Sequence, residues 1–123
     1  MSSDTKSYKD LLVWQKGLVL VRAVYHLSRN FPQDERFGLV AQMRRAAVSV
    51  PSNIAEGQAR HTRGEFIQFI SHAEGSLAEL ETQILIAVDL KFCSQLEAAP
   101  MLAQVEELQK MLNGLRQKLA TRP

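Results

Sequence analysis

The sequence predicts an all-α protein, an antiparallel up-and-down four-helix bundle whose second helix is kinked at a proline. Three observations lead to this fold class. Apolar residues recur at alternating steps of three and four in four segments of the chain. The connections between these segments are short, which favours antiparallel neighbours. The chain shows no strand alternation, hairpin signal, internal repeat or low-complexity segment.

The first helix is expected from about Leu11 to about Asn30, with Asp10 as its N-cap. Phe31-Pro32 ends it, because the residue before a proline disfavours helix. Its apolar residues form two rows, which are Leu11, Trp14, Leu18, Val21, Tyr25 and Val13, Leu20, Val24, Leu27. Two apolar rows make a wider apolar face than contact with one neighbouring helix requires, and further apolar surface comes from Phe66, Phe69 and Phe92. This surplus serves either as extra core or as a subunit interface, and we expect self-association.

The second helix contains the stretch "RRAAVSVPSNIAEG". Asp34 and Glu35 suit its positive N-terminal end, and Gly57 is its expected C-terminal stop. Its apolar face continues across Pro51, which predicts one bent helix rather than two; the residues of that face are Leu39, Met43, Ala46, Val50 and Ile54. Proline inside a helix costs about 3 kcal/mol or more. Ser49, Ser52 and Asn53 are expected to offer hydrogen bonds to the freed backbone groups.

The third helix is expected from about Arg63 to about Lys91, and Thr62 with Glu65 forms a capping box at its start. Its seam consists of Phe66, Ile70, Ala73, Leu77, Leu80, Ile84 and Ala87. The seam of the last helix consists of Met101, Val105, Leu108, Leu112, Leu115 and Leu119. Its start is open: Ser94 and Glu97 make a second capping box, whereas Pro100 favours a start closer to Ala99.

Length and composition restrict the class of protein. The 123 residues suffice for one domain, expected over residues 10–120 after a flexible segment 1–9. With 46% hydrophobic and 23% charged residues, wholesale disorder is excluded. No apolar run reaches the roughly 20 residues that span a membrane, and the polar N-terminus lacks a signal-peptide core, so we expect a cytoplasmic protein. The lone Cys93 fits a reducing compartment and is expected to be a buried thiol.

The sequence carries no strong catalytic or metal-binding pattern. Paired Glu-x-x-His motifs, a glycine-rich phosphate loop and a nucleophile elbow are all missing. His26, His61 and His72 are single, so we expect no metal, no cofactor and no small-molecule substrate. The nearest approach to a helical ribonuclease is Arg22 with His26, which share a helical face but miss the usual spacing. We therefore predict that the protein is not an enzyme.

Basic residues gather in the first half of the chain. The net charge is +2, but residues 1–63 hold ten Lys or Arg against five Asp or Glu. The candidate nucleic-acid-binding residues lie on the second helix and its flanking loops, and they are Arg36, Arg44, Arg45, Arg60, His61 and Arg63. Arginine binds phosphate bidentately, and a ring of identical subunits would multiply such contacts. A solvated, ion-paired arginine face is the alternative interpretation.

Four stretches resemble the helical-bundle proteins encoded by intervening sequences in bacterial 23S ribosomal RNA genes. They are "YKDLLVWQKG", "FPQDERFGLVAQMRRAAVSVPSNIAEG", "EFIQFISHAEGSLAELETQI" and "KMLNGL". Such proteins are similar to the accessory protein of diversity-generating retroelements, a homopentameric barrel that binds nucleic acid through a basic surface. The resemblance places Arg44, Arg45, Arg60 and Arg63 in the family's basic segments. It implies a structural role for Pro51, Asn53, Glu56 and Gly57.

The expected function is therefore a non-enzymatic, homo-oligomeric accessory protein that binds nucleic acid, with ribosomal RNA as one potential partner. The resemblance implies a pentamer. A protein-interaction scaffold that binds no nucleic acid is the alternative. A ribonuclease that uses Arg22 and His26 is a third reading.

Overall fold

The structure is a computed structural model that describes residues 7–121. Within this range the chain is helical and contains no strand. The four long helices are α1 (Leu12–Ser28), α2 (Leu39–Gln58), α3 (Arg63–Asp89) and α4 (Gln95–Thr121). Two short 3₁₀ helices, η1 (Tyr8–Asp10) and η2 (Gln33–Glu35), precede α1 and α2.

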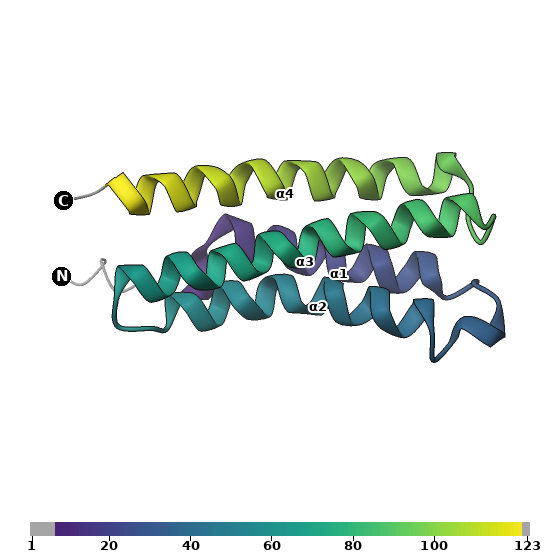
Figure 1. Cartoon of the computed structure of the whole chain (residues 1–123), viewed down its shortest axis with the longest axis horizontal. Coiled ribbons are helices and arrows are strands. Elements are labelled where there is room, and N and C mark those ends of the chain that lie inside the picture. The colour runs from purple at the N-terminus through teal and green to yellow at the C-terminus, as the bar shows by residue number, and fades with distance from the viewer. Residues whose placement is uncertain (1–6, 122–123) are drawn as a thin grey trace.

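The long helices form an antiparallel up-and-down bundle, as predicted. Each helix packs against its neighbours in sequence, and α4 also packs against α1, so the four helices close around one core. Figure 1 shows the start of α1, the end of α4 and the α2–α3 connection at one end of the bundle. The α1–α2 and α3–α4 connections lie at the opposite end. This arrangement determines which basic residues can share a surface.

The predicted seams form the core. From Ile70 to Ala87, every predicted position on α3 is fully buried, and Phe66 lies half-buried at the end of the row. On α1 the two rows separate. The row with Leu20 and Val24 faces the core, whereas most of the row with Trp14 and Leu18 is half-buried over the α1–α2 groove.

The capping box at Ser94 is complete, whereas at Thr62 the side-chain cap of the helix is present and Glu65 accepts from the Thr62 hydroxyl. The Thr62 hydroxyl accepts a hydrogen bond from the Glu65 backbone N–H at 3.1 Å, and it donates to Glu65 Oε1 at 3.0 Å. At α4, Ser94 Oγ accepts from the Glu97 N–H at 3.0 Å, and Glu97 Oε1 accepts from the Ser94 N–H at 2.9 Å. The α4 start is therefore at the capping box, and the helix continues through Pro100.

The expected starts of the first two helices need correction. Asp10 is not the cap of α1, because it belongs to η1, and the extended residue Leu11 occupies the cap position. Glu35 lies in η2 rather than in the first turn of α2. It still serves α2, since its Oε1 accepts a hydrogen bond from the Leu39 backbone N–H at 3.1 Å. A carboxylate from a preceding turn thus does the work of an N-cap.

The α3 helix ends two residues before the expected Lys91. The Phe92 N–H donates to the Ala87 carbonyl at 2.8 Å, and the Lys91 N–H donates to the Val88 carbonyl at 3.0 Å. This is the Schellman pattern, whose residue after the cap adopts left-handed backbone. Lys91 takes that place with φ 64°, where glycine is more usual. The turn sends the chain back into α4.

α2 runs through Pro51 as one helix, and the kink itself stays a prediction. Pro51 is buried against α1, where Gly17 leaves room for it: a Cβ at position 17 would lie 3.3 Å from the Pro51 Cβ. Asn53 Nδ2 donates to the Ser49 carbonyl at 2.8 Å, and Ser49 Oγ contacts Ser76 Oγ of α3 at 2.7 Å. The polar residues around the proline therefore join α2 to its neighbour.

Gly57 is not the stop of α2. It lies within the helix, which ends at Gln58 with a right-handed cap at Ala59. A Cβ at position 57 would lie 2.6 Å from the Phe69 Cβ and 3.0 Å from Phe66 Cδ1. The glycine is needed for the close approach of α2 and α3, not for left-handed backbone.

Candidate nucleic-acid interface

The predicted basic residues do not form one patch. Arg36 and Arg44 lie near the α1–α2 connection, whereas Arg60, His61 and Arg63 lie at the α2–α3 connection. Arg44 lies in the second turn of α2 and Arg60 follows the end of this helix, so the two groups are about 20 Å apart at 1.5 Å per residue. We call them the junction cluster (Arg29, Arg36, Arg44) and the loop cluster (Arg60, His61, Arg63). Arg45 is exposed on α2, turned about 100° from Arg44.

In the loop cluster, Arg60 is held by two contacts. Its Nη2 lies 3.6 Å from Glu56 Oε2, and its guanidinium carbon lies 4.8 Å from the centre of the Phe69 ring. Both members of the ion pair are well exposed, so water and salt weaken the attraction. The guanidinium therefore stays available to a phosphate. His61 and Arg63 are exposed beside it.

In the junction cluster, Arg44 is fixed by hydrogen bonds to the end of α1. Its Nε donates to Ser28 Oγ at 3.0 Å, and its Nη2 donates to the Tyr25 carbonyl at 3.4 Å. The guanidinium also lies over the Tyr25 ring, 4.4 Å from its centre. Ser28 is buried, which makes this a positioned arginine rather than a freely moving surface side chain.

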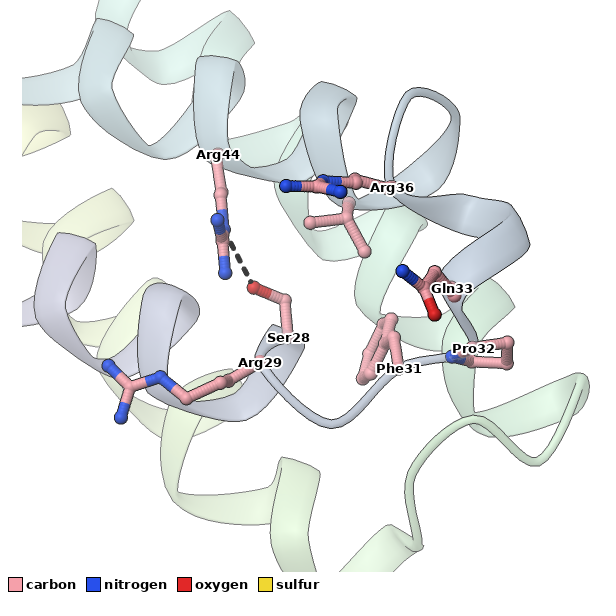
Figure 2. A pocket seen from close by; sticks show the side chains of 8 residues that line it. Ser28, Arg29, Phe31, Pro32, Gln33, Arg36 and Arg44 are labelled. Carbon is pink, nitrogen blue, oxygen red and sulfur yellow. Dashed lines mark hydrogen bonds between the residues drawn. The ribbon is translucent and has the colours of Figure 1, made fainter.

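Beside Arg44 the surface opens into a hollow of about 370 Å³, which we call the junction pocket (Figure 2). Its lining comes from the end of α1, the connection and the start of α2, and consists of Ser28, Arg29, Phe31, Pro32, Gln33, Arg36, Val40 and Arg44. None of these described residues is acidic. Figure 2 shows Arg36 and Arg44 reaching the pocket from different directions, while Arg29 points away.

Sequence reasoning missed the junction pocket and Arg29. Arg29 follows the last residue of α1. From the sequence, a cation in this position is expected only to interact favourably with the helix dipole. Its place beside Arg36 and Arg44 depends on how the α1–α2 connection folds back. No motif marks that geometry in the sequence.

The four residues of the predicted structural motif lie along the last two turns of α2. Pro51 and Gly57 are buried in contacts with α1 and α3, and Asn53 is half-buried on its Ser49 contact. Glu56 is exposed, and its carboxylate pairs with Arg60. These contacts are those of helix packing and surface pairing rather than of a catalytic centre.

The residues of the ribonuclease alternative are Arg22 and His26, both exposed on α1. His26 lines a separate hollow of about 220 Å³ with Cys93 and Glu97, and Arg22 does not line it.

Burial raises the pKa of the Cys93 thiol, and the negative charge of Glu97 raises it further. The thiol is therefore protonated and weakly reactive near neutral pH.

Residues 7–121 contain no group of three or more His, Cys, Asp or Glu side chains able to hold a metal ion. None of the helices in this range is both long and apolar enough to cross a membrane.

Comparison with known proteins places the chain among others of its fold. The family model of the 23S rRNA-intervening sequence protein matches residues 9–114. A crystal structure from Bacteroides thetaiotaomicron, described as a protein with unknown function from the S23 ribosomal protein family, matches with a TM-score of 0.77. The two sequences are 19% identical, and the match covers 85% of this chain and 98% of that one. No curated protein matches the chain.

Proposed function

The chain belongs to the 23S rRNA-intervening sequence protein family, and from this premise we propose that it is a non-enzymatic, homo-oligomeric cytoplasmic protein that binds nucleic acid. The observation that carries the proposal is the display of arginines at both ends of α2. Arg36, Arg44 and Arg45 have no ion pair to a carboxylate within the described part of the chain. Guanidinium groups that lack a protein carboxylate suit the phosphates of a nucleic-acid backbone.

Self-association would multiply these contacts. One subunit offers two small clusters about 20 Å apart, which is a weak footprint by itself. A closed ring repeats each cluster at fixed spacing, so that one strand contacts several subunits. Exposed apolar side chains supply a surface for such assembly, with Leu96 85% exposed and Leu85 52% exposed. The pentamer is the assembly that the family resemblance implies.

The test of nucleic-acid binding is a variant in which Arg44, Arg45, Arg60 and Arg63 are all changed to Ala. We expect its affinity for short RNA and DNA to fall at least tenfold at about 50 mM salt, with a shallower dependence on salt, because fewer counterions are released. Fluorescence anisotropy across a salt series measures both quantities. Circular dichroism checks that the bundle remains folded.

The matched control removes the same charge from exposed lysines elsewhere, which are Lys9, Lys91, Lys110 and Lys118. An equal loss of affinity in both variants contradicts a specific role for the arginines. A parent protein that ignores RNA and DNA in dilute salt contradicts nucleic-acid binding altogether.

Self-association is tested by Leu96→Asp. Leu96 lies in the first turn of α4, where an aspartate interacts favourably with the helix dipole, so the change spares the fold. If α4 contributes to the interface, the association constant falls at least tenfold in sedimentation equilibrium. Gln95→Asp is the control, since it adds the same charge one residue away and removes no apolar surface. Unchanged association in Leu96→Asp removes this face from the interface.

A protein-interaction scaffold is the second candidate, favoured by an apolar groove of about 320 Å³ between α1 and α2. Trp14, Leu18 and Val48 are among its lining residues. Pull-down after nuclease treatment separates the two functions. A protein partner that persists without nucleic acid favours the scaffold.

A further inference from the structure

We propose that the junction pocket binds a terminal phosphate group, that of a nucleotide or of a nucleic-acid end. The nucleic-acid form of the ligand rests on the proposed function, whereas the nucleotide form does not. The pocket's donors, its buried apolar residues and a neighbouring aromatic ring each support the phosphomonoester as the ligand.

The donors come from separate elements and meet at one hollow. Figure 2 shows the side chains of Arg36 and Arg44 at this pocket, with the amide of Gln33 turned toward it, and all three residues line it. Neither arginine is paired with a carboxylate within residues 7–121. Two cations beside one space repel each other, and an anion bound between them reverses that cost.

One of the two arginines is already positioned. The hydrogen bonds from Arg44 to Ser28 Oγ and to the Tyr25 carbonyl leave the rest of its guanidinium for a ligand. A preorganised donor loses little side-chain entropy on binding. Arg36 is exposed at the end of η2, with its guanidinium carbon 5.8 Å from the centre of the Phe37 ring. It can close on the anion from the other side.

The shape and charge favour a terminal phosphate over an internal phosphodiester. Phe31 and Val40, both buried, form the inner wall, so the hollow suits the end of a chain better than a strand passing through it. A terminal phosphate carries about −1.5 to −2 charges at pH 7 and three free oxygens, which matches two guanidiniums. An internal phosphodiester carries one charge.

A neighbouring aromatic side chain favours a nucleotide as the source of the phosphate. Phe37 is 90% exposed and follows Arg36 directly in the chain. An exposed ring beside a phosphate site offers a surface on which a base can stack, an interaction that tolerates any base. A lipid or phosphopeptide gains nothing comparable from this ring.

The experiment compares two ligand pairs that differ only in the phosphate. One pair is adenosine 5′-monophosphate and adenosine, and the other is a short RNA with a 5′-phosphate and the same RNA with a 5′-hydroxyl. Titration calorimetry on the full-length protein gives the affinity ratio within each pair. We expect the phosphorylated member to bind at least tenfold more tightly, and Arg36→Gln to reduce that ratio to below threefold.

Arg45→Gln is the control, since it removes one charge from the neighbouring position on α2, about 100° around the helix from Arg44, and Arg45 does not line the pocket. We expect it to weaken both RNAs alike and to leave their ratio unchanged. Equal affinities within both pairs overturn the proposal, even if both RNAs bind and the proposed function stands. If neither RNA binds, the proposed function fails. In that case tighter binding of adenosine 5′-monophosphate than of adenosine supports the phosphate site, and equal binding of the two refutes it.

Discussion

Gly57→Ala is expected to destabilise the protein by about 1 kcal/mol, although alanine is the better helix former. The new methyl group would lie 2.6 Å from the Phe69 Cβ, an atom attached directly to the α3 backbone. Because the Phe69 Cβ is fixed to the backbone, it cannot move aside as the end of a long side chain does. The helices α2 and α3 must therefore move apart. Overpacking of this kind costs about 1–3 kcal/mol, which outweighs the gain in helix propensity of about 1 kcal/mol. Urea unfolding measures the change.

Gly75→Ala is the matched control. Gly75 is an exposed residue inside α3, and a Cβ there meets nothing within 4 Å. The same substitution is therefore expected to stabilise the protein by up to about 1 kcal/mol. Opposite signs at the two glycines support the close approach of α2 and α3. A neutral or stabilising Gly57→Ala contradicts it.

Much of the helical architecture was predictable because its signals are local. A seam such as the one from Ile70 to Ala87 depends only on the 3.6-residue period, and the structure buries every member of it. A capping box needs two side chains three residues apart, and the predicted box at Ser94 is complete, while at Thr62 the predicted side-chain cap is present. The sequence leaves the start of the last helix open between Ser94 and Pro100, and the structure has it at Ser94.

The errors arose where tertiary contacts determine a residue's role. Gly57 reads as a helix stop, because the sequence does not show that Phe69 packs against its Cα. From the sequence, Asp10 is expected to be the N-cap of α1. The Ser7 hydroxyl instead caps a short 3₁₀ helix that includes Asp10, so Leu11 occupies the N-cap position of α1. Local patterns list the residues able to take a role, and packing selects among them.

The candidate site was predictable in composition and not in geometry. Counting charges finds the arginines of the second helix, but not that α2 separates Arg44 from Arg60 by most of its length. The lining of the junction pocket also includes Arg29, which follows the end of the preceding helix. Arginines that are clustered in the sequence therefore need not share one surface, because the directions of the helices decide which of them lie together.

Leu77→Ala is expected to cost about 3 kcal/mol of unfolding free energy, the largest effect of the stability variants. Leu77 is fully buried at the middle of the α3 seam. Its truncation removes the transfer free energy of the lost carbons and leaves a cavity that a closed bundle fills poorly. Denaturant unfolding at low protein concentration measures this cost within the subunit.

Leu85→Ala is the control from the same helix. Leu85 is 52% exposed in the isolated subunit, so its truncation is expected to cost less than about 1 kcal/mol. Repeating both titrations at high protein concentration adds a second readout. A cost that rises with concentration for Leu85→Ala alone places Leu85 beneath another subunit, because only association buries it. Equal costs for the two variants at low concentration contradict the assignment of the α3 core face.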